Sequence, residues 1–159
     1  MRSARHAALA TCALALSAPA ATACTLVLAE HPGGRELSRA PLDPIAPQLR
    51  VGFVHSVLGT PVEDLYRFRR GPAGWRAHLL AERFEGEGYG LPHAAGPGER
   101  LQRDGLGWRL DTDRVVHPLV VRALAAQRME LRLPGHDPLP LASLGVPAVA
   151  LHAERCPDA

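Results

Sequence analysis

The sequence predicts an all-β fold, a single small antiparallel domain with the form of a β-sandwich or a barrel. Two observations predict it. Glycine and proline, 15 of each in 159 residues, recur at short intervals along the chain and mark turns. The segments between these turns are short, and in several of them apolar and polar residues alternate with the period of two that is typical of a half-buried strand.

Alternation is clearest in residues 65–69, where Tyr66 and Phe68 share one face of the expected strand and two arginines share the other. Residues 49–55 and 129–133 alternate in the same way. The other expected strands are, in chain order, Thr25–Glu30, Arg35–Ala40, Trp75–Phe84, Gly107–Leu110, Val115–Val121 and Val146–Ala153.

Two segments depart from this pattern. Residues 119–129 are rich in alanine, which favours a helix, but the β-branched valines just before and within them favour a strand, so we expect a strand followed by a turn. Residues 86–107 contain nine glycines and prolines and form the longest expected loop. A loop of this length in a small domain is often functional or mobile.

Residues 1–23 have the three-part layout of a secretory signal peptide: a positive start, an apolar stretch from Ala7 to Ala15, and small residues before the cleavage site. An uncleaved anchor is the alternative, but the apolar stretch is shorter than the ~20 residues that a membrane-spanning helix needs. We therefore expect an exported protein of the periplasm or cell envelope. Its mature part, residues 24–159, is one β domain without a transmembrane segment.

The two cysteines of the mature part, Cys24 and Cys156, lie at its two ends. An even pair in an oxidising compartment predicts a disulfide, which would place the first and last strands next to each other. The alternative uses Cys24 alone, because a cysteine directly after a leader can be the lipid-modified first residue of a lipoprotein. The sequence leaves both alternatives open.

Charge argues against a nucleic-acid partner. The formal net charge is +2, and all 18 basic residues are arginines. Loss of residues 1–23, which contain Arg2 and Arg5 and no acidic residue, leaves equal numbers of basic and acidic residues. A nucleic-acid-binding domain normally shows a clear basic excess.

The first candidate site is the segment from His55 to Glu63, which ends one expected strand, turns at Gly59, and starts the next. A hairpin would bring His55 and Ser56 near Val62 and Glu63. Imidazole, hydroxyl and carboxylate groups at one sheet edge could bind an anion, a metal or a polar ligand. The structural alternative is a buried histidine whose hydrogen bonds are satisfied by a carboxylate.

The second candidate site is the segment Glu85–Pro92, with glycines at positions 86, 88 and 90. Alternating glycines allow backbone N–H groups to converge on a ligand, but they also allow the positive φ angles of a tight bend. The segment has neither the lysine and hydroxyl pattern of a phosphate loop nor a dinucleotide fingerprint. A structural bend is the favoured interpretation.

Neither a metal site nor a catalytic site is predicted. The eight histidines include no pair at metal-binding spacing, so we assign no metal and no cofactor. Ser56, His117 and Asp64 supply the residue types of a Ser-His-Asp catalytic triad, but no G-x-S-x-G nucleophile-elbow motif supports it. We therefore assign no catalytic residue.

These segments together resemble a known family. The matching features are Cys24-Thr25-Leu26 after the leader, Phe53 with His55-Ser56-Val57, Thr60-Pro61-Val62 with Tyr66, Glu82-Arg83-Phe84 before Gly88-Tyr89-Gly90-Leu91-Pro92, and the late Val115-Val116-His117. The chain is similar in these features to the small bacterial domain of unknown function 1850. Gly86-Glu87 departs from the Ser-Phe that is usual there.

The resemblance implies an exported protein encoded beside TAXI-type TRAP transporters, which import small organic acids. It implies no known reaction. We expect a non-enzymatic domain that binds a ligand, the transporter's membrane subunit or its binding protein. The expected binding residues are His55, Ser56, Glu63, Tyr66, Gly88, Gly90 and His117. The alternatives are a serine/histidine hydrolase and a purely structural envelope lipoprotein.

Overall fold

The computed structural model describes residues 24–157; the predicted signal peptide, residues 1–23, lies outside the described residues. The chain forms the strands β1 (Thr25–Glu30), β2 (Glu36–Pro41), β3 (Gln48–Val54), β4 (Pro61–Gly71), β5 (Gly74–Phe84), β6 (Arg100–Asp104), β7 (Gly107–Val116), β8 (Leu119–Arg122), β9 (Glu130–Arg132), β10 (Leu139–Pro140) and β11 (Ala148–Glu154). Two short 3₁₀ helices, η1 (Ala125–Gln127) and η2 (Leu141–Leu144), complete the described part.

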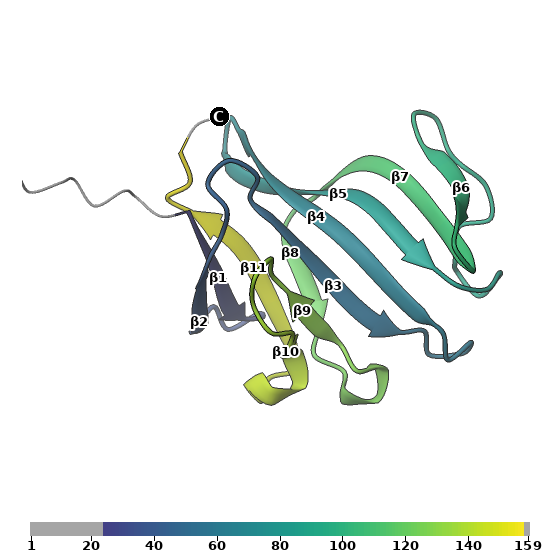
Figure 1. Ribbon diagram of the computed structural model, residues 1–159. Helices are drawn as coiled ribbons and strands as arrows, with labels where there is room; N and C mark the ends of the chain where they lie inside the picture. The colour runs from purple at the N-terminus through teal and green to yellow at the C-terminus, as the bar shows by residue number, and fades with distance from the viewer. Residues whose placement is uncertain (1–23, 158–159) are drawn as a thin grey trace, which may run out of the picture.

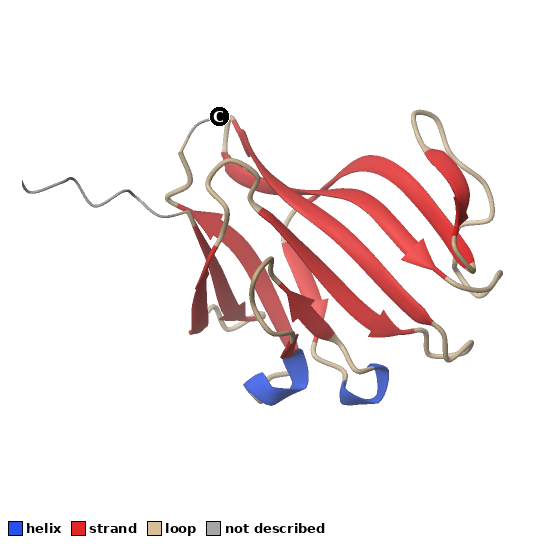
Figure 2. Ribbon diagram, viewed as in Figure 1, coloured by secondary structure: helices blue, strands red, loops and turns tan. Residues whose placement is uncertain are grey.

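Within the described residues the strands form two antiparallel sheets (Figures 1 and 2). The small sheet has the order β2-β1-β11-β8, and the large sheet has the order β10-β9-β3-β4-β5-β7-β6. Figure 1 shows the small sheet beside one half of the large sheet, while β6, β7 and the neighbouring ends of β3, β4 and β5 extend beyond it. The predicted all-β, sandwich-like fold is confirmed.

Most of the expected strands are present, and two expectations are wrong. The segment Val115–Val121 is not one strand: β7 ends in the large sheet and β8 begins in the small sheet, with His117 and Pro118 between them. Proline has no N–H to donate to a ladder, which suits a break at this position. The segment 86–107 is not irregular throughout, because it contains β6, which pairs with β7.

The main core lies between the two sheets. It contains fully buried leucines from both sheets, among them Leu26 and Leu28 on β1 and Leu49 on β3. A second, smaller cluster of Val62, Phe84 and Leu110 lies on the large sheet. It is flanked by Phe53, Leu91, Leu101 and Trp108.

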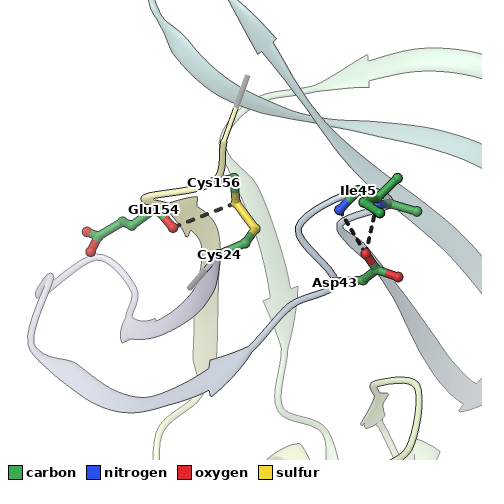
Figure 3. Close-up of a disulfide and its surroundings, with 6 residues drawn as sticks. Cys24, Asp43, Ile45, Glu154 and Cys156 are labelled. Atoms are coloured by element: carbon green, nitrogen blue, oxygen red, sulfur yellow. Dashed lines mark hydrogen bonds between the residues drawn. A yellow bond between two sulfur atoms is a disulfide. The ribbon is translucent and has the colours of Figure 1, made fainter. Parts of the chain in front are cut away.

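The predicted disulfide between Cys24 and Cys156 is confirmed, across a separation of 132 residues (Figure 3). As expected from that bridge, β1 pairs antiparallel with β11, and Thr25 lies opposite Glu154. The connection from β2 to β3 is fixed nearby, since the Asp43 carboxylate accepts hydrogen bonds from the backbone N–H groups of Ile45 (2.8 Å) and Ala46 (3.1 Å). These bonds hold the pKa of Asp43 below its ordinary value.

None of the helices within residues 24–157 has the length and apolar character needed to cross a membrane.

Candidate functional site

A pocket of about 240 Å³ lies at the end of the large sheet where β3 ends and β4 begins. Three apolar strand residues, Phe53, Val62 and Phe84, form part of its lining. Two carboxyl residues of β4 and β5, the turn between β3 and β4, the loop after β5, and η1 supply the rest. The further lining residues are His55, Ser56, Asp64, Glu82, Tyr89, Gly90, Leu91, Pro92 and Gln127.

The floor of the pocket follows from strand alternation. On β4, Val62 and Asp64 have the same parity, so both side chains face inward. The register places Phe84 of β5 opposite Val62, and Glu82 opposite Asp64. A pair of carboxyl groups therefore lies beside a pair of apolar side chains on the same sheet face.

Asp64 is half-buried, and its principal hydrogen-bond donor is the Tyr66 hydroxyl, whose oxygen is 3.3 Å from Oδ2. Burial, followed by the negative charge of Glu82, raises the pKa of Asp64 to about 7. Burial also raises the pKa of Tyr66, and the Asp64 carboxylate adds to that shift. The floor of the pocket thus contains a carboxyl group that takes up its proton near neutral pH.

Glu82 differs from Asp64 because it has a cationic partner. Arg114 donates to its carboxylate with an N–O distance of 3.0 Å and also lies 3.6 Å from Glu99. Glu99 in turn accepts a hydrogen bond of 2.8 Å from the buried Thr112 hydroxyl. Hydrogen bonds from the Gly96 N–H and from Thr112 hold the pKa of Glu99 below its ordinary value. The charge of Glu82 is compensated, whereas that of Asp64 is not.

His55 joins the two segments that form the pocket wall. Its Nδ1 accepts hydrogen bonds from the backbone N–H groups of Val57 and Leu58, each at 3.2 Å. Because Nδ1 accepts, the proton of the neutral ring is on Nε2, which donates to the Tyr89 carbonyl at 3.2 Å. The imidazole therefore fixes the β3–β4 turn and connects it to the loop after β5.

Two further contacts hold this loop against the turn. The Thr60 hydroxyl donates to the Glu85 carbonyl at 2.8 Å. Gly86 packs closely on Leu58, since a Cβ added to Gly86 would lie 2.9 Å from Cδ1 of Leu58. The φ angle of Gly86, +95°, also favours glycine. Residues 88–90 continue with three positive φ angles, of which that of Tyr89 is 53°. The wall is therefore a preformed part of the fold.

The structure brings some of the predicted binding residues together. His55, Ser56 and Gly90 line the pocket. Tyr66 is buried behind it and reaches it through its hydrogen bond to Asp64. Gly88 shapes the loop, where its carbonyl accepts a hydrogen bond from the Leu91 N–H at 3.1 Å.

The structure places the other two predicted residues elsewhere. Glu63 alternates with Asp64 and faces the opposite side of the sheet, where it pairs with Arg132 (3.1 Å), Arg50 (3.5 Å) and Arg83 (3.7 Å). His117 lies exposed between β7 and β8 and is not among the lining residues.

The carboxyl pair was not predicted from the sequence. Asp64 entered only as a member of the unsupported triad, and Glu82 was not among the expected site residues. The signal that could have found Asp64 is the same alternation that placed Tyr66 and Phe68 on one face, since Asp64 has their parity. Within residues 24–157, no group of three or more His, Cys, Asp or Glu side chains is arranged to hold a metal ion.

The chain matches the model of a known family. The model of the Domain of unknown function (DUF1850) matches residues 49–139, which run from β3 to β10 and include the whole lining of the pocket. No curated protein and no solved structure matches the chain.

Proposed function

This chain belongs to the DUF1850 family, and we propose that it is a non-enzymatic binding domain of the cell envelope that serves as an accessory of a TAXI-type TRAP transport system. The observation that carries the proposal is the pocket of about 240 Å³ between the β3–β4 turn and the loop after β5. Both segments are among the features that carry the family resemblance, and they meet at His55.

The composition of the pocket supports binding of a small molecule. Ligand sites are typically apolar concavities with a few polar groups that orient the ligand. Here Phe53, Phe84 and Leu91 supply apolar wall, and Asp64 and Ser56 supply polar groups. The volume is below the ~300–1,000 Å³ of pockets for drug-sized molecules, so the ligand is small.

The bonding of His55 supports a non-enzymatic role. A serine hydrolase needs a histidine nitrogen that can take the proton of the serine hydroxyl. Both ring nitrogens of His55 are already engaged with backbone groups of Val57, Leu58 and Tyr89. We therefore assign His55 the role of holding the pocket wall, and Ser56 the role of contacting the ligand.

The rim of the pocket supports a protein partner. Val57 in the turn is 61% exposed and Tyr89 in the loop is 70% exposed, so each segment presents a large apolar side chain to solvent. Aromatic residues exposed beside a pocket are typical of interfaces. The proposed partner is the transporter's membrane subunit or its binding protein. A lipid anchor is not part of the proposal, because it needs the Cys24 sulfur that is bonded to Cys156.

The test combines uptake with purification. A strain that lacks the gene should lose most uptake by the neighbouring transporter, and the wild-type protein should restore it. Ser56→Trp places a bulky side chain on an exposed lining residue and should not restore uptake. Leu106→Trp is the matched control, since Leu106 is exposed in the turn between β6 and β7, does not line the pocket and is not part of the proposed interface.

Tagged wild-type protein from the envelope fraction should carry transporter subunits with it. Full uptake without the gene, together with no recovered subunit, would overturn the proposed function.

A further inference from the structure

The charged groups of the pocket restrict what it can hold. Three ionisable side chains line it: Asp64, Glu82 and His55. The His55 ring accepts two backbone hydrogen bonds at Nδ1, which requires that nitrogen to be unprotonated and the ring to be neutral. The lining therefore contributes negative charge and no cation.

Asp64 is the group that lacks compensation. Among the described residues, no arginine or histidine forms an ion pair with it, and the Tyr66 hydroxyl at 3.3 Å is a neutral donor. Arg114 is the cation that influences it, but Arg114 is bonded to Glu82 at 3.0 Å. A half-buried carboxylate without a cation is unfavourable, and a ligand that supplies a cation would stabilise it.

We infer that the pocket binds a small organic amine, whose ammonium group pairs with the Asp64 carboxylate while its hydrocarbon part packs on Phe53, Phe84 and Leu91. This inference rests on the proposed binding function and specifies the ligand class. The three apolar residues come from β3, β5 and the loop after β5, so they provide wall on more than one side. Glu82 and the Ser56 hydroxyl can accept the remaining N–H groups.

The same arrangement disfavours an organic acid. An acid would bring a second negative charge next to Asp64 and Glu82, and it would find no cationic side chain in the lining. Like charges in a partly dry site repel strongly. The lining therefore favours an amine over an acid of similar shape.

Amine binding is coupled to the protonation of Asp64. The groups that act on this carboxyl are Glu82 of β5, Tyr66 and Glu63 of β4, and Arg114 of β7. With a pKa of about 7 in the empty pocket, Asp64 must release its proton to pair with an ammonium ion below that pH. The amine affinity should then rise by up to about tenfold per pH unit as the pH increases towards 7.

The test uses two probes of similar shape and opposite charge. Isothermal titration calorimetry of the exported protein with 2-phenylethylamine should give binding at least about tenfold tighter than with 3-phenylpropionate. Asp64→Asn should weaken amine binding by at least about tenfold, because the neutral amide cannot pair with the ammonium. Glu130→Gln on β9 is the matched control, because Glu130 pairs with Arg132, does not line the pocket and is not among the groups that act on Asp64, so amine binding should be unchanged.

Several results would overturn the inference: no binding of the amine, equal or tighter binding of the acid, or an unchanged amine affinity in Asp64→Asn. A fall in amine affinity between pH 5.5 and 7 would also overturn it, and this readout needs no variant. If the amine fails while Ser56→Trp still abolishes uptake, the proposed function stands and the ligand class is wrong. If the amine does not bind and Ser56→Trp still restores uptake, both the ligand class and the proposed function are wrong.

Discussion

Strands β4 and β5 pass through two halves of the molecule that are covered in different ways. In one half, their inward-facing residues pack beneath the small sheet and belong to the main core. In the other half, the loop after β5 and the β3–β4 turn provide the cover. The inward-facing residues are Tyr66, Phe68, Ala77 and Leu79 in the first half, and Val62, Asp64, Glu82 and Phe84 in the second.

The difference shows where this fold tolerates polar groups. A carboxyl group between two packed sheets would lose its water without gaining a partner, at a cost of several kcal/mol. Beneath a loop, Asp64 retains a hydrogen bond to Tyr66 and an opening into the pocket. The sheet-covered half therefore supplies stability, and the loop-covered half supplies the binding site.

The largest expected effect concerns the disulfide of the sheet-covered half. Replacing Cys24 and Cys156 together by alanine opens a loop of 132 residues. In the chain-entropy model this should lower the free energy of unfolding by about 4–5 kcal/mol. Chemical denaturation of oxidised wild-type and double-variant protein measures the difference.

Reduced wild-type protein is the control for this prediction, and its midpoint should approach that of the double variant. Equal midpoints for oxidised wild type and double variant would show that closure of β1 on β11 does not stabilise the domain.

A matched pair of leucines compares the two halves directly. Leu49 on β3 is 1% exposed in the main core, and Leu110 on β7 is 2% exposed in the smaller cluster. Leu49→Ala should cost about 3–5 kcal/mol because two packed sheets cannot close on the cavity, whereas Leu110→Ala should cost about 2–3 kcal/mol because a loop can. Denaturation midpoints at a common slope measure both costs. Equal losses would mean that the loop-covered half is as rigidly packed as the other.

The sheet-covered half was the easier one to predict from sequence. Alternation and regular turns give most of its strands, and the pairing of Cys24 with Cys156 places β1 beside β11. Strand β6 was missed because residues 100–104 contain a single apolar residue, Leu101, and form an exposed edge. Periodicity gives little signal in such a strand.

The loop-covered half was harder because its site depends on strand register. Glu63 and Asp64 are neighbours in sequence, and a shift of one residue exchanges which of them faces inward. The predicted carboxylate, Glu63, lies on the outer face of the sheet among arginines. The position of His117 was also hard to predict. It lies where the chain passes from the large sheet to the small sheet, and the alternation of apolar and polar residues does not show where such a passage occurs.

The smallest expected change, counted per pH unit, is a pH dependence of stability that belongs to the loop-covered half. The pKa of Asp64 is about 7 in the folded protein and about 3.9 in an unfolded chain, so the folded state holds this proton more tightly. Its stabilising contribution is complete below about pH 4 and is lost as the pH rises through about 7. The free energy of unfolding of the wild type, relative to Asp64→Asn, should therefore fall by at most about 1.4 kcal/mol per pH unit in this window.

The difference between the two proteins is the quantity to measure, because other carboxyls act in the opposite direction. Hydrogen bonds and ion pairs hold the pKa values of Glu99, Asp113 and Glu154 below their ordinary values, so these groups stabilise the fold as the pH rises. They are common to both proteins and cancel in the difference. Glu130→Gln should not show this difference from the wild type, since Glu130 pairs with Arg132 and is not among the groups that act on Asp64. The free-energy difference between the two proteins could instead be constant between pH 4 and 7. That result would show that Asp64 is as well hydrated as an exposed residue. The two halves would then differ only in packing.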